Sequence, residues 1–300
     1  MPEQGTRSDA VNRTITLTSL AMIAFAGNSL LCRAALQHTA IDAASFTTIR
    51  LVSGALMLWL VVRVRRGKYT GGGGWLSALA LFAYAAGFSF AYVSLSAATG
   101  ALLLFGAVQA TMIGYGIWAG ERLLRLQIVG LVIALAGLTG LLLPGLSAPP
   151  LYGSVLMLGA GVAWGLYSLR GKGAGDPATV TASNFLRTVP IAAALSIITL
   201  KVSSLDAAGL VYAVLSGAVA SGLGYAIWYT ALPALKATSA ATVQLSVPVI
   251  AALGGVVILG EAITLRLVLA SIAILGGIAL VFLEKQHAHT AQQIAPANRS

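Results

Sequence analysis

The sequence predicts an all-α integral membrane protein with ten transmembrane helices, arranged as two five-helix halves of opposite orientation. Apolar residues make up 58% of the chain and charged residues only 9%, and the mean hydropathy is +0.90. Apolar runs recur at the length of roughly 20 residues that a helix needs to cross about 30 Å of hydrocarbon. The distribution of basic residues and an internal repeat indicate how these helices are oriented and related.

The apolar runs define the predicted spans. They lack strict alternation of polar and apolar residues, which favours helices over the short strands of a membrane barrel. The predicted spans are residues 14–33, 43–62, 75–95, 99–118, 126–143, 151–170, 180–200, 207–228, 238–258 and 266–283. We therefore expect a helical bundle whose charged residues lie mainly in its loops and tails.

Basic residues are distributed unevenly between the two sides of this bundle. With the N-terminus inside, thirteen Lys and Arg residues fall in cytoplasmic segments, and only Arg33, Lys201 and Arg266 fall on the opposite side. An excess of positive charge in cytoplasmic segments orients membrane proteins. It predicts a multi-pass protein of the cytoplasmic (inner) membrane with both termini in the cytoplasm. The net charge of +10 then requires no nucleic-acid partner.

The two halves of the chain are related by an internal repeat. Four residue pairs mark it at a shift of 137 residues, with a three-residue insertion before the last pair: Arg33 and Arg170, Arg50 and Arg187, Tyr92 and Tyr229, Glu121 and Glu261. Each half holds five spans, and an odd number places the second half upside down relative to the first. The expected segments are a cytoplasmic tail (1–13), the first half (14–146), the second half (147–284) and a second cytoplasmic tail (285–300).

The repeat and three local motifs resemble the EamA branch of the drug/metabolite transporter (DMT) superfamily. The motifs are the segment AWGLYSLR that ends at Arg170, an arginine one-third into the second helix of each half, and Gly-Glu before each half's last helix. The resemblance covers residues 14–284, and within the family it is strongest to exporters of aromatic amino acids. Gly27 and Asn28 depart from the family's aromatic-Gly pair, and no proline in the fourth span matches Pro248, so the halves are chemically unequal.

The resemblance implies a basket in which helices 1 to 4 and 6 to 9 line a central cavity and helices 5 and 10 pack outside it. The fifth and tenth spans agree, because they contain almost no polar side chains and no Tyr or Trp. Small residues allow helices to approach closely in lipid. The glycines expected to serve this purpose are Gly130, Gly137, Gly140, Gly276 and Gly277.

The charged residues argue against a cation pump and against an enzyme. All eight Asp and Glu residues fall in loops or at span ends, whereas transporters of cations or protons commonly use a carboxylate inside the membrane. The sequence shows no Ser/His/Asp arrangement, no metal-ligand spacing and no phosphate-binding loop. We expect a transporter without cofactor or metal, whose partners are a small-molecule substrate and the lipid bilayer. No obligate protein partner is evident from the sequence.

Polar and aromatic residues inside the spans are the candidates for substrate binding. In lipid each polar group needs a partner, so these residues should face the protein interior or a wet cavity. The candidate cavity-lining residues are Asn28, Tyr84, Phe88, Gln109, Trp164, Tyr167, Tyr225 and Gln244. Gln109 and Gln244 fit equally well as hydrogen-bond partners between helices. Tyr92, near a span end, fits the aromatic belt at a membrane interface.

Four further residues are candidates for gating or for structural anchoring: Arg50, Arg187, Pro190 and Pro248. Arg50 lies seven residues beyond Ala43, roughly 10 Å along its helix, where a long side chain can extend to the interface or bond to neighbouring carbonyls. The inverted repeat puts Arg187 near the opposite face. We expect Arg50 and Arg187 mainly to anchor the structure, and as the alternative each arginine latches one gate. We do not expect the two arginines to form one shared anion site. The prolines are expected to bend spans seven and nine.

These features predict a secondary transporter that exports small amphipathic metabolites by alternating access, above all aromatic and other apolar amino acids. Rings can stack on the solute, and amides can meet its amino and carboxyl groups without fixing a net charge. A multidrug or other metabolite exporter of the same fold is the alternative. Sugar phosphates fit less well, because a phosphate usually requires a pair of buried cationic side chains.

Overall fold

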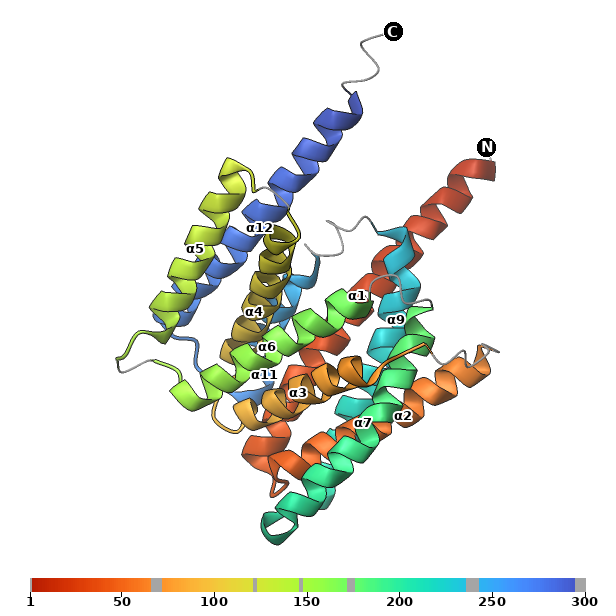
Figure 1. Ribbon diagram of the computed structural model, residues 1–300, viewed down its shortest axis with the longest axis vertical. Helices are drawn as coiled ribbons and strands as arrows, with labels where there is room; N and C mark the ends of the chain where they lie inside the picture. Colours follow the sequence, from red (N-terminus) through yellow and green to blue (C-terminus); the bar gives the residue numbers. More distant parts are fainter. Residues whose placement is uncertain are drawn as a thin grey trace.

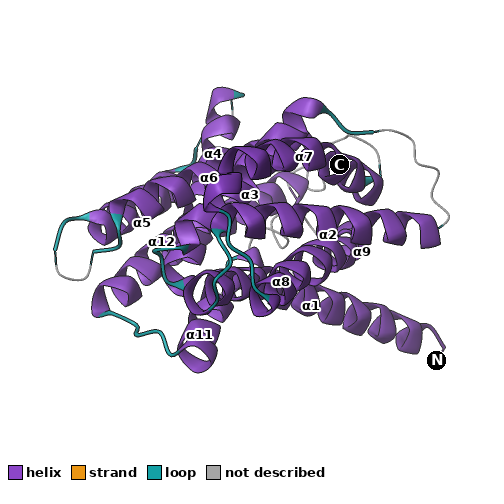
Figure 2. Ribbon diagram, turned by 90° about the horizontal axis from the view of Figure 1, so that it is seen from below, coloured by secondary structure: helices purple, strands orange, loops and turns teal. Residues whose placement is uncertain are grey.

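The computed structural model describes residues 2–65, 72–120, 123–145, 148–171, 176–235 and 243–294, with side chains from residue 12 to residue 281 of these ranges. All regular structure in the described ranges is helical (Figure 2). Eight of these helices are long and apolar enough to cross a membrane, and two shorter apolar helices accompany them. The helix that starts at Pro2 and the helix that ends at Ile294 extend from the same end of the bundle (Figure 1). The protein is therefore a helical, multi-pass membrane protein.

Most helices begin and end within a few residues of the predicted spans. They are α1 (Pro2–His38), α2 (Ala43–Val64), α3 (Trp75–Tyr92), α4 (Ala97–Trp118), α5 (Arg125–Leu142), α6 (Leu151–Gly171), α7 (Pro177–Thr199), α8 (Ala207–Val214), η2 (Leu215–Leu223), α9 (Gly224–Ala231), α11 (Ser246–Leu259) and α12 (Leu265–Ile294). Short 3₁₀ turns, η1 (Leu200–Val202) and η3 (Leu232–Ala234), follow α7 and α9. The predicted ninth span starts at residue 238, but residues 236–242 lie outside the described residues, as does Glu121.

The eighth predicted span is a continuous helix that contains both α-helical and π-helical segments. Its middle, η2, is a π-helix between the α-helical segments α8 and α9. A side chain added at Gly217 would overlap the backbone of Arg50, so only glycine lets η2 approach α2 this closely. π-helical segments are rare and frequently occur at functional sites. This winding is not visible in the hydropathy of the sequence.

Aspartates fix the starts of several helices. Asp42 caps α2 by accepting hydrogen bonds from the backbone N–H groups of Ala44 (2.9 Å) and Ser45 (3.0 Å), and Asp176 caps α7. Asp42 also accepts from the Ser204 backbone at 2.8 Å, which ties the loop before α2 to the loop before α8. Burial opposes ionisation of Asp42, but the hydrogen bonds from Ser45 and Ser204 outweigh it and lower the pKa of the carboxyl.

The helices form a central group and a peripheral pair (Figure 1). In the central group α2 packs on α7, α3 on α6, α4 on α6 and α11, and α1 on η2, α9 and α11. The pair α5 and α12 pack on each other and contact the rest mainly through α4. This is the peripheral position that the apolar composition of the two spans predicts.

Glycines hold the α5–α12 pair together, but fewer than expected. A Cβ at Gly130 would overlap the carbonyl oxygen of Gly277, and a Cβ at Gly277 would overlap that of Gly130. Gly137 lies against the side chain of Ala273 in the same way. Gly140 and Gly276 have open space where a side chain would be, so the expectation that they mediate close packing is wrong.

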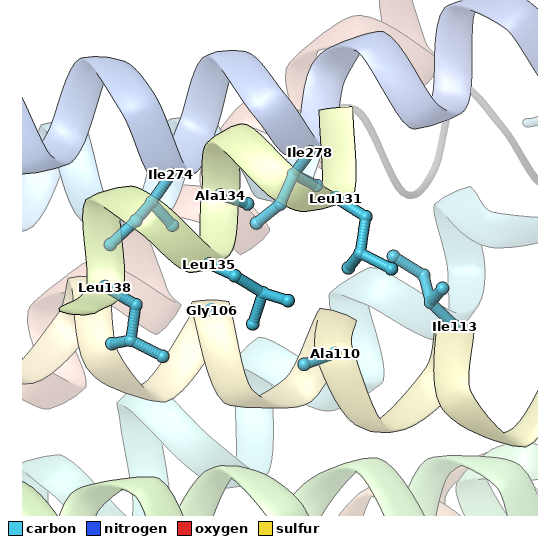
Figure 3. Close-up of a pocket in the computed structure, with 9 residues that line it drawn as sticks. All are labelled: Gly106, Ala110, Ile113, Leu131, Ala134, Leu135, Leu138, Ile274 and Ile278. Atoms are coloured by element: carbon cyan, nitrogen blue, oxygen red, sulfur yellow. The ribbon is translucent and has the colours of Figure 1, made fainter. Parts of the chain in front are cut away.

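An apolar pocket lies where α4, α5 and α12 meet (Figure 3). Its lining includes Ile113 on α4, Leu131 and Leu138 on α5, and Ile274 and Ile278 on α12. None of its lining residues carries a polar side chain. The pocket therefore offers no side-chain hydrogen bond to a polar solute and is not the candidate functional site.

Replacing Gly277 by leucine is expected to destabilise the protein, because the new side chain must displace α5 from α12. Overpacking of this kind typically costs about 1–3 kcal/mol. The matched control is Gly276→Leu, one residue away, where nothing lies within 4 Å of the added Cβ. Thermal unfolding in detergent should show a lower midpoint for Gly277→Leu only. Equal midpoints for the two variants would contradict the packing.

Candidate functional site

The hydroxyl group of Tyr84 joins three helices in the interior of the central group. Arg50 on α2 donates a hydrogen bond to it at 3.0 Å, and Asn28 on α1 donates at 3.4 Å. The Asn28 side-chain oxygen accepts a hydrogen bond at 2.6 Å from Ser216 on η2. All four residues are buried. Each therefore finds a partner inside the protein, as a polar group in lipid must.

A row of aromatic rings continues from Tyr84 into the second half of the chain. The ring of Trp164 on α6 lies 4.8 Å from that of Tyr84 and 5.3 Å from that of Tyr167, between centroids. Trp164 stacks on Tyr225 of α9 at 5.4 Å and 20°, and Phe88 lies 5.5 Å from Tyr84. Such separations are favourable for aromatic pairs. The rings thus form one surface shared by α3, α6 and α9.

These contacts bring six of the eight predicted cavity-lining residues into one group. We call it the central cluster, and with two further members it comprises Asn28, Arg50, Tyr84, Phe88, Trp164, Tyr167, Ser216 and Tyr225. Gln109 is buried on α4 and Gln244 is half-buried before α11. In the described part of the chain neither takes part in the ring contacts or hydrogen bonds that join the central cluster.

Residues of α7 extend the central cluster, and sequence reasoning missed them. Tyr167 donates a hydrogen bond to Thr181 at 3.4 Å, Asn184 donates to Tyr167 at 3.5 Å, and Thr181 donates to Tyr229 at 3.3 Å. Thr181 and Asn184 lie three residues apart on one face of a helix. Polar residues at this spacing inside an apolar span are a signal that could have identified them.

The structure places Arg50 differently from the sequence expectation. Its side chain is only 2% exposed, and its guanidinium lies over the rings of Phe88 and Tyr84, 4.7 and 5.3 Å from their centroids. Two ring faces and a phenol oxygen attract the cation inward, so it does not extend to the membrane interface. The expectation that Arg50 anchors at the interface or on a neighbouring helix end is therefore wrong.

Arg187, the repeat partner of Arg50, has another environment. Its guanidinium donates to the carbonyl oxygen of Ser183 at 3.1 Å and to the Ser183 hydroxyl, one turn earlier on α7. These contacts anchor Arg187 to its own helix. The two arginines thus share a repeat position but not a role in packing.

The two prolines also differ. Pro190 lies in the interior of α7, where it removes one backbone hydrogen bond, and a bend there stays a prediction. Pro248 lies in the first turn of α11, just after a break in the helix at Leu245. A proline is tolerated in a first turn, because its missing N–H would have no helical partner. Pro248 therefore lies beside a break inside the predicted ninth span (238–258), and a bend of that span stays a prediction.

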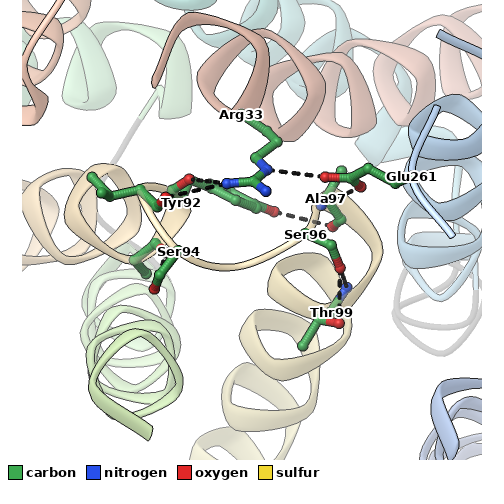
Figure 4. Close-up of polar contacts among 9 residues, drawn as sticks. Arg33, Tyr92, Ser94, Ser96, Ala97, Thr99 and Glu261 are labelled. Atoms are coloured by element: carbon green, nitrogen blue, oxygen red, sulfur yellow. Dashed lines mark hydrogen bonds and ion pairs between the residues drawn. The ribbon is translucent and has the colours of Figure 1, made fainter. Parts of the chain in front are cut away.

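A second polar group, drawn in Figure 4, joins the C-terminal part of α1 to two loops. Arg33 on α1 forms an ion pair with Glu261 of the α11–α12 loop, with 2.9 Å between Nε and Oε1. The Arg33 guanidinium also donates to the carbonyl oxygens of Tyr92 (3.0 Å) and Val93 (3.3 Å), and Glu261 accepts from the backbone of Ala97 at 2.8 Å. We call these five residues the end cluster. It ties α1, the turn between α3 and α4, and the loop before α12 together.

Tyr92 connects the end cluster to the central cluster. Its side chain is fully buried, its hydroxyl donates to the Ala97 carbonyl at 3.3 Å, and its ring meets Phe88 edge-on at 4.7 Å. The expectation that Tyr92 belongs to an aromatic belt at the membrane interface is therefore wrong. Sequence reasoning assigned no role to the pair of Arg33 and Glu261, although the repeat had marked both residues.

The end cluster should contribute measurably to stability. Arg33 and Glu261 are only 12% and 11% exposed, and removing one partner of a buried pair typically costs about 3–5 kcal/mol, because the other charge is left uncompensated. Arg33→Gln should therefore lower the unfolding midpoint, whereas Lys201→Gln, at an exposed position, should not. The double variant Arg33→Gln/Glu261→Gln should recover part of the loss. A single variant as stable as the control would contradict the pairing.

Comparisons with known proteins agree with this architecture. The profile of the EamA-like transporter family matches residues 151–283. An uncharacterized protein of Pseudomonas aeruginosa is 60% identical over 270 residues, which are 90% of this chain and 94% of that protein. The threonine/homoserine exporter RhtA of Salmonella typhimurium is 36% identical over 155 residues, 49% of this chain and 51% of the exporter.

A solved crystal structure shares the fold at 18% sequence identity. Its TM-score is 0.63, and the match covers 92% of this chain and 98% of the solved one. The family match, the relatives and the apolar helices agree on a membrane transporter that is not an enzyme. The second half of the chain, residues 151–283, thus belongs to the EamA-like transporter family.

Proposed function

We propose that this protein is a secondary transporter that exports amino acids, above all aromatic and other apolar ones, across the cytoplasmic membrane by alternating access. The central cluster carries this proposal. In it, the stacked rings of Trp164 and Tyr225 lie beside a buried polar group made by Asn28, Arg50 and Tyr84. An apolar side chain fits the rings, and an ammonium and carboxylate fit the polar group.

Two similarities support an amino acid as the substrate. The relative RhtA, which matches about half of this chain, is named as a threonine/homoserine exporter. The resemblance of the sequence to the aromatic amino acid exporter YddG favours substrates with a ring. The ring surface would also accept an apolar drug, so a multidrug exporter is the competing function. The buried polar group favours the amino acid, because an apolar drug would leave Arg50 Nη1 without a hydrogen-bond partner.

We also propose that the chain consists of ten spans in two inverted five-span halves, 14–146 and 147–284. Helix contacts support this arrangement, because replacing each helix by its counterpart in the other half turns one observed contact into another observed contact. The contact of α1 with α9 corresponds to that of α6 with α3, and the contact of α1 with α11 corresponds to that of α6 with α4. Three further contacts join counterpart helices to each other and are unchanged by this replacement: α2 with α7, α4 with α11 and α5 with α12. Inverted repeats of this kind are a recurring basis for alternating access.

The end cluster is then the outer gate. If both termini are cytoplasmic, as the excess of basic residues in the cytoplasmic segments favours, the Arg33 end of α1 lies at the external face. Substrate release to the outside requires α1 and the α11–α12 loop to separate there. That step breaks the ion pair between Arg33 and Glu261 (Figure 4). We propose that these movements of the helices are supported by Gln109, Gln244, Arg187 and Pro190.

Proteoliposomes loaded with unlabelled phenylalanine should take up labelled phenylalanine or tryptophan by saturable counterflow. Trp164→Ala should raise the KM about tenfold, since loss of a stacked ring corresponds to about 1.4 kcal/mol. Trp118→Ala is the matched control, because Trp118 is 82% exposed at the end of α4. Threonine belongs in the substrate panel. Flux of apolar drugs without saturable flux of any amino acid would refute the proposal in favour of the competing function.

A further inference from the structure

Arg50 is a buried cation whose hydrogen-bonding capacity is only partly used. Nη2 donates to the Tyr84 hydroxyl, but the buried Nη1 has no hydrogen-bond partner in the described part of the chain. The rings of Phe88 and Tyr84 cover the guanidinium without accepting from Nη1. A buried charge is costly unless it is paired, and arginine cannot become neutral in a protein. The arrangement therefore favours an incoming anion.

Described carboxylates do not supply that anion. Asp42 bonds to Ala44, Ser45 and Ser204, Asp176 to Thr179, Asp206 to Gly209, and Glu261 to Arg33 and Ala97. Glu3, Asp9, Glu121 and Glu284 have no described side chains, and the sequence places them outside the predicted spans. A counter-ion for Arg50 at this depth must come from outside the described protein.

The surroundings of Arg50 limit what this anion can be. Its partner Tyr84 also holds Asn28, and the ring of Tyr84 meets Trp164, where the aromatic surface begins. An anion at Nη1 therefore lies next to rings and an amide. A small carboxylate attached to an apolar group matches both features, and guanidinium binds carboxylates strongly. A phosphate would call for more than one cation, and Arg187 is bound to Ser183 on its own helix.

We infer that Arg50 binds the carboxylate of the transported amino acid through its free Nη1. This inference rests on the proposed function and adds to it, because it assigns the substrate a charged group and a residue that recognises it. The side chain of the amino acid then extends over Trp164 and Tyr225. The site is therefore cationic, whereas the sequence predicts recognition of the carboxyl group by amides.

The wild-type protein provides a test that needs no substitution. Phenylalanine and phenylalaninamide differ in the carboxylate, and a site built around a hydrogen-bonded group strongly rejects an analogue that lacks it. Competition with labelled phenylalanine in counterflow should show an inhibition constant for the amide about 100-fold higher. An amide that competes as well as the acid would overturn the inference while leaving amino acid transport in place.

The variant Arg50→Gln tests the same recognition of the carboxylate by changing the protein instead of the substrate. It should raise the KM for phenylalanine about 100-fold and leave the weak inhibition by phenylalaninamide unchanged, and Arg50→Lys should retain part of the affinity. The matched control is Arg63→Gln on the same helix, where the guanidinium covers the exposed Trp59. Folding is checked by the unfolding midpoint in detergent.

The outcomes separate the inference from the proposed function. A folded Arg50→Gln variant with an unchanged KM would overturn the inference alone. If that variant does not fold, the comparison of acid and amide in the wild-type protein decides. Wild-type protein that transports no amino acid would refute the proposed function, and the inference with it.

Discussion

The hydrogen bonds that Arg50 and Asn28 donate to the Tyr84 hydroxyl bring α1, α2 and α3 together in an interior surrounded by lipid. In that setting a hydrogen bond within the protein stabilises a buried polar group, because lipid supplies no partner for it. Ser216 extends the group to the second half of the chain, and the π-helical winding of η2 accompanies this contact. The polar group therefore determines which faces of four elements meet.

The contacts between the two clusters form one continuous path. The Phe88 ring lies under the Arg50 guanidinium and against the ring of Tyr92, whose carbonyl oxygen accepts from Arg33. Under the proposed function, a carboxylate that draws Arg50 away from Phe88 changes the packing that supports the outer gate. Coupling through packed side chains of this kind needs no contact between the substrate and the gate itself.

Most of the helical framework could be predicted from the sequence. The length and apolarity needed to cross lipid are local properties, so α2 (Ala43–Val64) and α6 (Leu151–Gly171) begin at the predicted residues 43 and 151. Six of the eight candidate cavity residues also converge, since a polar or aromatic residue inside a span is directed to the interior. The exceptions, Gln109 and Gln244, carry the same sequence signal but lack contacts with the central cluster.

What could not be predicted depends on partners distant in the sequence. Arg50 turns inward because Tyr84 and Phe88 of another helix attract it, and position along α2 contains no information about them. Arg33 and Glu261 are 228 residues apart, and only the fold brings them together. The π-helix η2 approaches α2 closely at Gly217, and this contact also joins segments far apart in the sequence. Hydropathy is insensitive to all three features.

The most direct test of the central claim is an experimental structure of the full chain with phenylalanine bound. We expect the carboxylate within hydrogen-bond distance of Arg50 Nη1 and the phenyl ring against Trp164 and Tyr225. Phenylalanine bound at saturating concentration beside Gln109 and Gln244, away from Arg50, would contradict the account.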